Sequence, residues 1–209
     1  MSGLFITLEG PEGGGKTVIA KRLVEELTRR GHVVRSTREP GGTRLGERVR
    51  GIVLEQSADD RAAAIDRRAD ALLFNAARAQ LVAEVIRPAL DRGEVVLCAR
   101  YADSTLAYQG YGAGLPLDEL RALAAVATGD LKPDLTILLD VPPEIGIGRK
   151  TGASRNRFES SFDLAFHERV RAGFLALAGQ EPDRFRVIDS SRRIGAVIPE
   201  VVAAVLAAL

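Results

Sequence analysis

Short apolar runs alternate with helical patterns along the whole chain. Runs with the length and composition of buried strands occur at 4–8, 33–37, 95–99, 135–140 and 184–188. Apolar residues recur at helical spacing in the segments 17–31, 43–55, 66–90, 117–127, 161–178 and 197–209. Alternating β and α units predict an α/β fold of the three-layer α/β/α type, in which helices cover a five-stranded parallel sheet.

No internal repeat and no linker of domain-boundary length interrupts this pattern, so we predict a single domain over residues 1–209. The C-terminal segment has apolar residues at helical spacing, including Ile198, Val202 and Val205, which favours a helix packed on the sheet over a membrane anchor. The N-terminus enters a strand-like run at once, and no apolar run approaches the roughly 20 residues of a membrane span. We expect neither export nor membrane insertion.

Composition narrows the class of partner and the compartment. The 29 Lys and Arg residues nearly cancel the 28 Asp and Glu residues, and no long block of one sign suggests a nucleic-acid partner. The one cysteine, Cys98, lies in an apolar run, so we expect a buried thiol and no internal disulfide. This cysteine usage fits a cytoplasmic protein.

A glycine-rich segment after the first strand carries the strongest motif. Its sequence matches G-x-x-x-x-G-K-[ST], the P-loop, and it lies between a predicted strand and a predicted helix. The ATP-binding residues that it predicts are Gly10, Pro11, Glu12, Gly13, Gly14, Gly15, Lys16 and Thr17. Backbone N–H groups would face the phosphates, Lys16 would reach the β- and γ-phosphates, and Thr17 would ligate Mg²⁺. The complete spacing speaks against a turn that only connects strand and helix.

The P-loop by itself does not define a reaction, because GTPases, motor ATPases and small-molecule kinases share it. An Asn-Lys-x-Asp segment for guanine is missing from the sequence, and 209 residues leave no room for the additional modules of a large ATPase. A kinase of a small molecule fits best.

Candidates for a second, phosphorylated substrate follow the second and third strands. Arg38 and Arg100 each come after a strand, where the carboxyl end of a parallel sheet faces its ligand. Phe74 and Arg78 are four residues apart on one helical face, which offers an aromatic plane and a fork of donors to a base. Taken singly, Phe74 fits a core residue and either arginine fits a surface residue.

A basic stretch follows the fourth strand. Residues 149–157 read Arg-Lys-Thr-Gly-Ala-Ser-Arg-Asn-Arg, between two helical patterns. We predict a short basic lid at about 149–158 that closes over the transferred phosphoryl group, because arginines there would stabilise its negative charge. A solvated basic loop is the alternative.

Taken together, these segments resemble the thymidylate kinase family in its bacterial form, and the resemblance extends over nearly the whole chain. The segments that carry it are 9–12, 37–43, 73–74 with 77–78, 103–105 with 107–110, 133–136 with 139–140, and 157–159. The resemblance implies ATP and dTMP as substrates, dTDP as product, Mg²⁺ as cofactor, and a homodimer. The loop lacks a basic residue between Pro11 and Gly14, which matches the form in which lid arginines supply the charge.

The resemblance also implies a role for each candidate residue. Substrate-binding residues would be Glu12, Arg38, Phe74, Arg78, Arg100, Ser104, Thr105, Tyr108 and Gln109. Catalytic residues would be Lys16, Arg100, Arg149, Arg155 and Glu12, and the metal-binding residues would be Thr17 and Glu9. In the family's pattern, Phe74 stacks on thymine, Arg78 binds its carbonyl edge, and Tyr108 crowds the 2′ position of the sugar. The arginines Arg38 and Arg100 hold the phosphate of dTMP.

Three positions depart from the family's pattern. Ala99 stands where an acidic residue usually precedes Arg100, Asn156 stands where the lid commonly has Asp, and Val18 replaces a small hydroxyl residue. Ala99 leaves open a nucleotide-binding protein with impaired turnover, and a kinase of dUMP or another monophosphate is a further alternative. Phosphoryl transfer depends mainly on positioning and electrostatics, so we expect activity.

Overall fold

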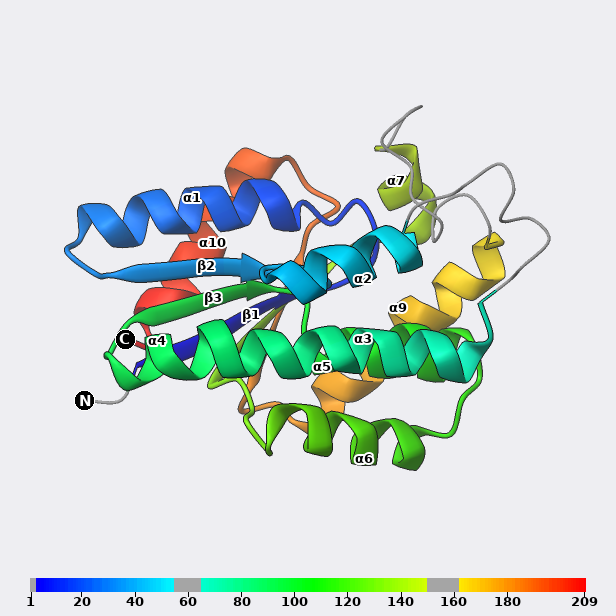
Figure 1. Cartoon of the computed structure of the whole chain (residues 1–209). Helices are drawn as coiled ribbons and strands as arrows, with labels where there is room; N and C mark the ends of the chain where they lie inside the picture. The colour runs from blue at the N-terminus through cyan, green and yellow to red at the C-terminus, as the bar shows by residue number, and fades with distance from the viewer. Residues whose placement is uncertain (1–2, 55–64, 150–161) are drawn as a thin grey trace.

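The computed structural model describes residues 3–54, 65–149 and 162–209. Five parallel strands form one sheet in the order β2-β3-β1-β4-β5 (Figure 1). The strands are β1 (Leu4–Glu9), β2 (Val34–Arg38), β3 (Val95–Ala99), β4 (Leu135–Asp140) and β5 (Phe185–Asp189). The predicted five-stranded parallel sheet is confirmed, and each strand lies within one residue of its expected position.

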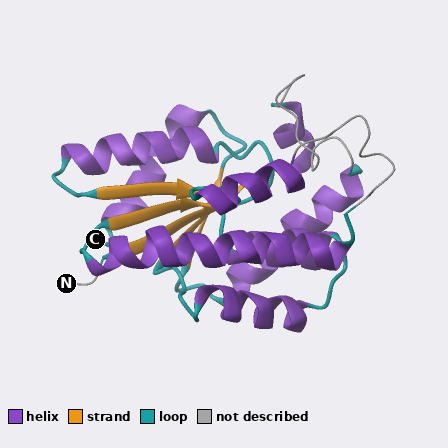
Figure 2. Ribbon diagram, viewed as in Figure 1, coloured by secondary structure: helices purple, strands orange, loops and turns teal. Residues whose placement is uncertain are grey.

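Helices lie on both faces of this sheet (Figure 2). They are α1 (Lys16–Arg29), α2 (Arg44–Leu54), α3 (Arg67–Leu81), α4 (Arg87–Asp91), α5 (Ala102–Thr105), α6 (Leu117–Thr128), α7 (Pro143–Gly148), α9 (Leu164–Gln180) and α10 (Ile194–Leu206). Two π-helical turns, η2 (Val82–Ile86) and η3 (Leu106–Gly112), complete the described elements. Of the helices in these ranges, none is long and apolar enough to cross a lipid bilayer.

The alternation of side chains along β1 assigns each face of the sheet to its own helices. Ile6 and Leu8 are fully buried in the core formed with α1 and α10. Phe5 points to the other face, where it packs with residues of α3, η2 and α4. Because successive side chains of a strand point to opposite faces, a strand covered on both sides has apolar residues at successive positions, as Phe5 and Ile6 show.

The long helix predicted over 66–90 is present over 67–91, with a π-helical turn inside it that the apolar spacing did not predict. α3 ends at Leu81, the π-helical turn η2 follows, and α4 begins at Arg87 with Pro88 in its first turn. Proline has no N–H to donate and crowds the preceding turn, which the wider π turn accommodates. The sequence pattern also missed α5, η3 and α7, which are too short for a helical period to show.

All five strands point in the same direction, so their carboxyl ends gather at one edge of the sheet, on the right in Figure 1. β1 ends at Glu9, β2 at Arg38 and β3 at Ala99. Strand order reverses here, because β2 and β3 lie on one side of β1 while β4 and β5 lie on the other. Crevices at such reversal points are where open α/β sheets bind ligands.

Candidate active site

The glycine loop adopts the tight turn that the motif predicts. Gly10 and Gly13 have φ of 130° and 72°, a region that favours glycine. A Cβ at Gly10 would lie 2.4 Å from the carbonyl oxygen of Leu139, and one at Gly13 would lie 2.0 Å from that of Gly146. The loop therefore packs against β4 and α7 with no room for a side chain at these two positions. Lys16 begins α1, and its Nζ donates to the carbonyl oxygens of Gly10 and Pro11 at 2.8 Å.

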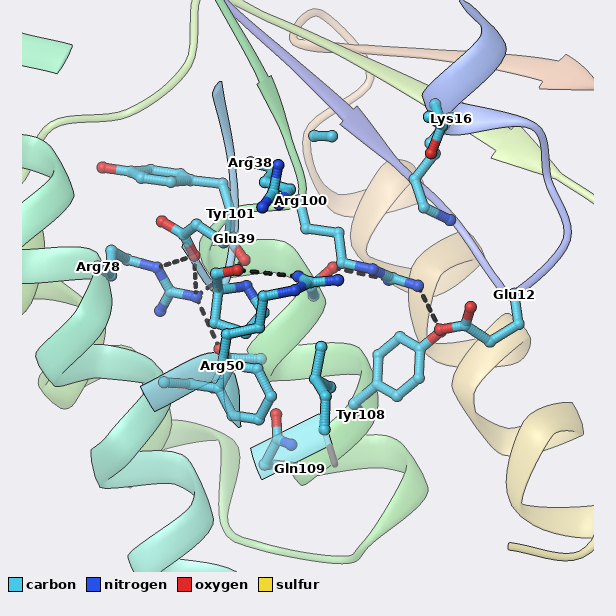
Figure 3. Close-up of a pocket in the computed structure, with 17 residues that line it drawn as sticks. Glu12, Lys16, Arg38, Glu39, Arg50, Arg78, Arg100, Tyr101, Tyr108 and Gln109 are labelled. Carbon is cyan, nitrogen blue, oxygen red and sulfur yellow. Dashed lines mark hydrogen bonds and ion pairs between the residues drawn. The ribbon is translucent and has the colours of Figure 1, made fainter. Parts of the chain in front are cut away.

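A pocket at the carboxyl edge of the sheet, here called the acceptor pocket, gathers the predicted substrate residues (Figure 3). Residues separated by almost a hundred positions meet there because β1, β2 and β3 end side by side. Its predicted members are Glu12, Lys16, Thr17, Arg38, Phe74, Arg78, Arg100, Ser104, Thr105, Tyr108 and Gln109. The lining residues that carried no site prediction are Glu39, Pro40, Arg50, Leu54, Ala99 and Tyr101.

Arg100 lies at the centre of a polar cluster in this pocket. Its Nη2 donates to a carboxylate oxygen of Glu12 at 2.5 Å and to the hydroxyl of Tyr108 at 3.1 Å. Its Nη1 donates to Ser104 and to the backbone of the glycine loop. The backbone of Arg100 has φ of 70°, a rare conformation for a side-chain-bearing residue that is typical of constrained sites. Tyr108 in turn donates to Glu12 at 3.0 Å.

Arg78 is buried in the pocket wall and is held by an ion pair with Glu39. Only 1% of Arg78 and 5% of Glu39 is exposed, and Nε of Arg78 donates to Glu39 at 2.9 Å. Its Nη groups donate to Asn75 Oδ1, to the carbonyl oxygen of Tyr101 and to Thr105 Oγ1. Burial raises the pKa of Glu39, an effect that the charge of Arg78 opposes. The predicted contact of Arg78 with a base stays a prediction.

Arg50 is the arginine that the sequence reasoning missed. It comes from α2, lines the acceptor pocket, and donates to the carbonyl oxygen of Pro40 at 2.9 Å. Burial, followed by the positive charges of Arg38 and Arg100, lowers the pKa of Arg50. In Figure 3, Arg50 and Arg100 both extend into the pocket. In the sequence, Arg50 is only a basic residue next to Val49 in a predicted helix, a pattern that many surface arginines share. Arg38 is paired with Glu47 at 3.1 Å.

A second cavity, here called the donor pocket, lies along the glycine loop and the start of α1. It is lined by Glu12, Gly13, Gly14, Gly15, Lys16, Thr17, Val18, Arg149, Ser190, Arg192, Arg193 and Ile194. The guanidinium of Arg149 donates to the carbonyl oxygens of Gly13, Ser190 and Ser191 at 2.8 to 3.1 Å. Arg149 thus links the glycine loop to the segment after β5. The rest of the predicted lid, Arg155 included, lies outside the described residues.

The two predicted metal ligands differ in their surroundings. Thr17 lines both pockets, so its hydroxyl is open to a phosphate-bound cation. Glu9 is fully buried, and its two carboxylate oxygens accept hydrogen bonds from the N–H of Tyr101 at 2.7 Å and the hydroxyl of Ser104 at 2.5 Å. Each oxygen keeps a second lone pair, and direct ligation of a metal by Glu9 stays a prediction.

The buried carboxyl of Glu9 predicts a pH-dependent stability. Burial, aided by the charge of Asp103, raises its pKa from 4.5 to about 7. In the unfolded chain, the Glu9 carboxyl ionises at lower pH. The contribution of its neutral form to the stability of the fold is therefore fully present below pH 4.5 and is lost as the pH rises through 7. Glu9→Gln stays neutral, so wild type should lose roughly 2 kcal/mol more stability than the variant between pH 5 and pH 8. Chemical unfolding at both pH values measures this difference.

Glu25→Gln is the matched control, because Glu25 is a half-exposed partner of Arg22 on the surface of α1. It should follow the wild-type pH dependence. Parallel stability curves for wild type and Glu9→Gln would show that Glu9 does not titrate in this range.

The two pockets meet at shared residues. Glu12, Lys16 and Thr17 line both of them, so phosphates bound on the glycine loop would adjoin an anion bound among the arginines. On a parallel sheet with helices on both faces, this is the architecture of a nucleoside monophosphate kinase of the P-loop class.

Comparison with known proteins gives the family. The family model described as thymidylate kinase matches residues 8–201. The chain is 54% identical over 204 residues to a thymidylate kinase of Deinococcus radiodurans, covering 97% of this chain and 96% of that protein. It is 51% identical to one of Thermomicrobium roseum, with 95% and 90% covered. The crystal structure of the Ehrlichia chaffeensis thymidylate kinase superposes with a TM-score of 0.77 at 32% identity, covering 98% and 99%. The chain belongs to the thymidylate kinase family.

Proposed function

We propose that this enzyme transfers the γ-phosphoryl group of ATP to dTMP and releases dTDP and ADP. One observation carries the proposal: the donor and acceptor pockets share Glu12, Lys16 and Thr17, so two bound nucleotides would meet phosphate to phosphate. Membership of the thymidylate kinase family supports dTMP as the acceptor.

The residues of the acceptor pocket fit a base, a sugar and a phosphate. Phe74 offers a partly buried ring on the wall of the pocket, and Arg78 lies one helical turn further along α3. Arg38, Arg50 and Arg100 supply positive charge for the phosphate of the acceptor. Tyr108 is buried beside Glu12, where its ring narrows the space next to the sugar. A ribose with a 2′-hydroxyl would fit poorly there.

Transfer would depend on positioning and on electrostatic stabilisation by this chain's own groups. Lys16 and Arg100 neutralise charge on the oxygens of the transferred group, and the N–H groups of the glycine loop hold the donor phosphates. Mg²⁺, which we propose is held through the hydroxyl of Thr17, would offset the negative charge of the phosphates. Magnesium usually keeps several water ligands, and the phosphates of the substrates would supply further oxygen ligands.

A coupled ADP-release assay tests the proposal. ATP and Mg²⁺ are supplied with dTMP, dUMP, UMP, CMP or AMP, one at a time, and binding of dTMP is measured by calorimetry in parallel. Turnover selective for dTMP is the expected result. Turnover of another monophosphate with none of dTMP would overturn the acceptor, and binding without turnover would overturn the reaction.

Ala99 gives a second test, because it lines the acceptor pocket where the family usually has a carboxylate. We expect Ala99→Asp to change kcat by no more than about tenfold, which corresponds to about 1.4 kcal/mol of transition-state stabilisation. Steady-state kinetics with dTMP measures the effect. A rise of several hundredfold at unchanged dTMP affinity would show that the natural site is impaired.

We also propose a homodimer. Leu45 and Ile52 on α2 and Leu72 on the neighbouring α3 are 43 to 57% exposed, and apolar residues grouped on adjacent helices are typical of subunit interfaces. Light scattering should give twice the chain mass, and Ile52→Glu combined with Leu72→Glu should halve it. Val33→Glu, at an exposed position before β2, is the control. A monomeric wild type would exclude the dimer.

A further inference from the structure

Asp70 is a buried carboxylate that belongs to none of the motifs above. It lies in the first turn of α3, on the same helical face as Phe74 and Arg78 at intervals of four residues. Only 6% of Asp70 is exposed. Its Oδ2 accepts a hydrogen bond of 2.9 Å from Nε2 of Gln109, which lies on η3 and lines the acceptor pocket.

This hydrogen bond fixes which end of the Gln109 amide faces Asp70. An ionised carboxylate only accepts hydrogen bonds, whereas an amide has a donating nitrogen and an accepting oxygen. The nitrogen of Gln109 must therefore face Asp70, and its oxygen must point the other way. In Figure 3 the oxygen of Gln109 points toward the other pocket residues drawn. Within residues 3–54, 65–149 and 162–209, no donor makes a hydrogen bond to this oxygen.

The pocket then presents a hydrogen-bond acceptor and a hydrogen-bond donor to the same edge of a bound pyrimidine base. Gln109 supplies the acceptor, and Arg78, which also lines the pocket, supplies the donor through Nη1, which carries two N–H groups, one of them donated to Asn75 Oδ1. Thymine and uracil carry an N3–H donor beside a C4 carbonyl acceptor. Cytosine carries the reverse, a bare N3 acceptor beside a C4 amino donor. The acceptor of Gln109 and the donor of Arg78 therefore match thymine and uracil and do not match cytosine.

We propose that Asp70 is a positioning residue, which holds Gln109 as an acceptor and so selects pyrimidine nucleotides that carry an N3–H over cytosine nucleotides. This inference rests on the proposed function, since it needs the base to lie in the acceptor pocket. A buried acceptor that stays unpaired with the wrong base rejects that base more strongly than a poor fit of shape does.

Replacing Asp70 by Asn keeps the size of the side chain and removes this constraint. Asparagine has both a donor and an acceptor, so it can pair with Gln109 in either orientation of the amide. In the variant, Gln109 can turn its nitrogen into the pocket and donate to a cytosine N3. The measured quantity is the ratio of kcat/KM for dTMP to kcat/KM for dCMP. A general loosening of the pocket would lower both values, whereas the proposal requires their ratio to change.

We expect Asp70→Asn to lower this ratio by at least about tenfold, and Asp70→Glu, which keeps an acceptor-only group, to stay closer to wild type. Asp118→Asn makes the same chemical change at a fully exposed position on α6 and should leave the ratio unchanged. A ratio for Asp70→Asn within twofold of wild type would overturn the inference.

Gln109→Ala provides a test that does not depend on the folding of an Asp70 variant. It should lower the ratio to a similar extent, and Asp70→Asn should have no further effect in the Gln109→Ala background, because the two residues act as one unit. An unchanged ratio in Gln109→Ala would also overturn the inference. If wild type fails to phosphorylate dTMP at all, the proposed function fails before any variant is compared.

Discussion

Arg100→Lys should lower kcat/KM for dTMP by about 10³-fold, a loss at the lower end of what a transition-state arginine supplies in phosphoryl transfer. The planar guanidinium of Arg100 reaches Glu12 and Tyr108 from one nitrogen, and Ser104 from another. Lysine presents one ammonium group on a flexible stem, so it cannot hold these positions together. The lost interaction lies between enzyme and phosphate, so kcat as well as KM should change.

Steady-state kinetics with varied dTMP and with varied ATP gives both constants, and thermal unfolding shows whether the variant is folded. Arg92→Lys is the control, because Arg92 is a half-exposed arginine whose partner, Glu94, lies at the opposite end of β3 from the pocket. It should leave kcat/KM unchanged. A loss smaller than tenfold in Arg100→Lys would mean that Arg100 serves the fold and not the reaction.

Glu39→Ala should reduce the free energy of unfolding by about 3 to 5 kcal/mol, the range observed when one partner of a buried ion pair is removed. Arg78 would remain buried, 1% exposed, without its carboxylate. The remaining acceptors, Asn75 and two groups of the 101–105 segment, satisfy hydrogen bonds but do not balance the charge. The wall that supports Phe74 should loosen as well, so KM for dTMP should rise.

Denaturant unfolding at pH 7 measures the loss. Glu119→Ala breaks an exposed pair with Arg68 and should cost less than about 1 kcal/mol. The double variant Glu39→Leu with Arg78→Met removes both charges, and it should recover much of the stability without recovering dTMP binding. A Glu39→Ala variant as stable as the Glu119→Ala control would contradict a buried, charged pair.

The strands of the sheet could be predicted from the sequence because each buried strand shows its own run of apolar residues. Phe5 and Ile6 face different helices yet both are apolar, so β1 could be recognised without knowing its neighbours. The π-helical turn after Leu81 could not be found in this way. Apolar spacing varies little between an α turn and a single π turn, and Pro88 was compatible with either a first turn or a kink.

The candidate site also has a part that could be predicted from the sequence and a part that could not. Residues predicted to contact phosphates or a base lie in recognisable segments, such as Lys16 in the glycine loop, and the structure places those of them that it describes along two adjoining pockets. Partners that act on those residues were missed. Asp70 and Gln109 are 39 positions apart, and so are Glu39 and Arg78, and nothing in either local sequence indicates the pairing. Such partners depend on how elements pack, which a motif does not encode.

The contact between Arg100 and Glu12 makes phosphate binding an exchange of one anion for another. The guanidinium of Arg100 has a carboxylate oxygen of Glu12 at 2.5 Å and the hydroxyl of Tyr108 at 3.1 Å. A phosphate bound at Arg100 would compete with this internal monoanion, so a doubly charged phosphate would gain more attraction there than a singly charged phosphate ester. The enzyme would thereby select its ligand by charge as well as by shape. Nucleosides and their neutral analogues would leave the ion pair between Arg100 and Glu12 intact.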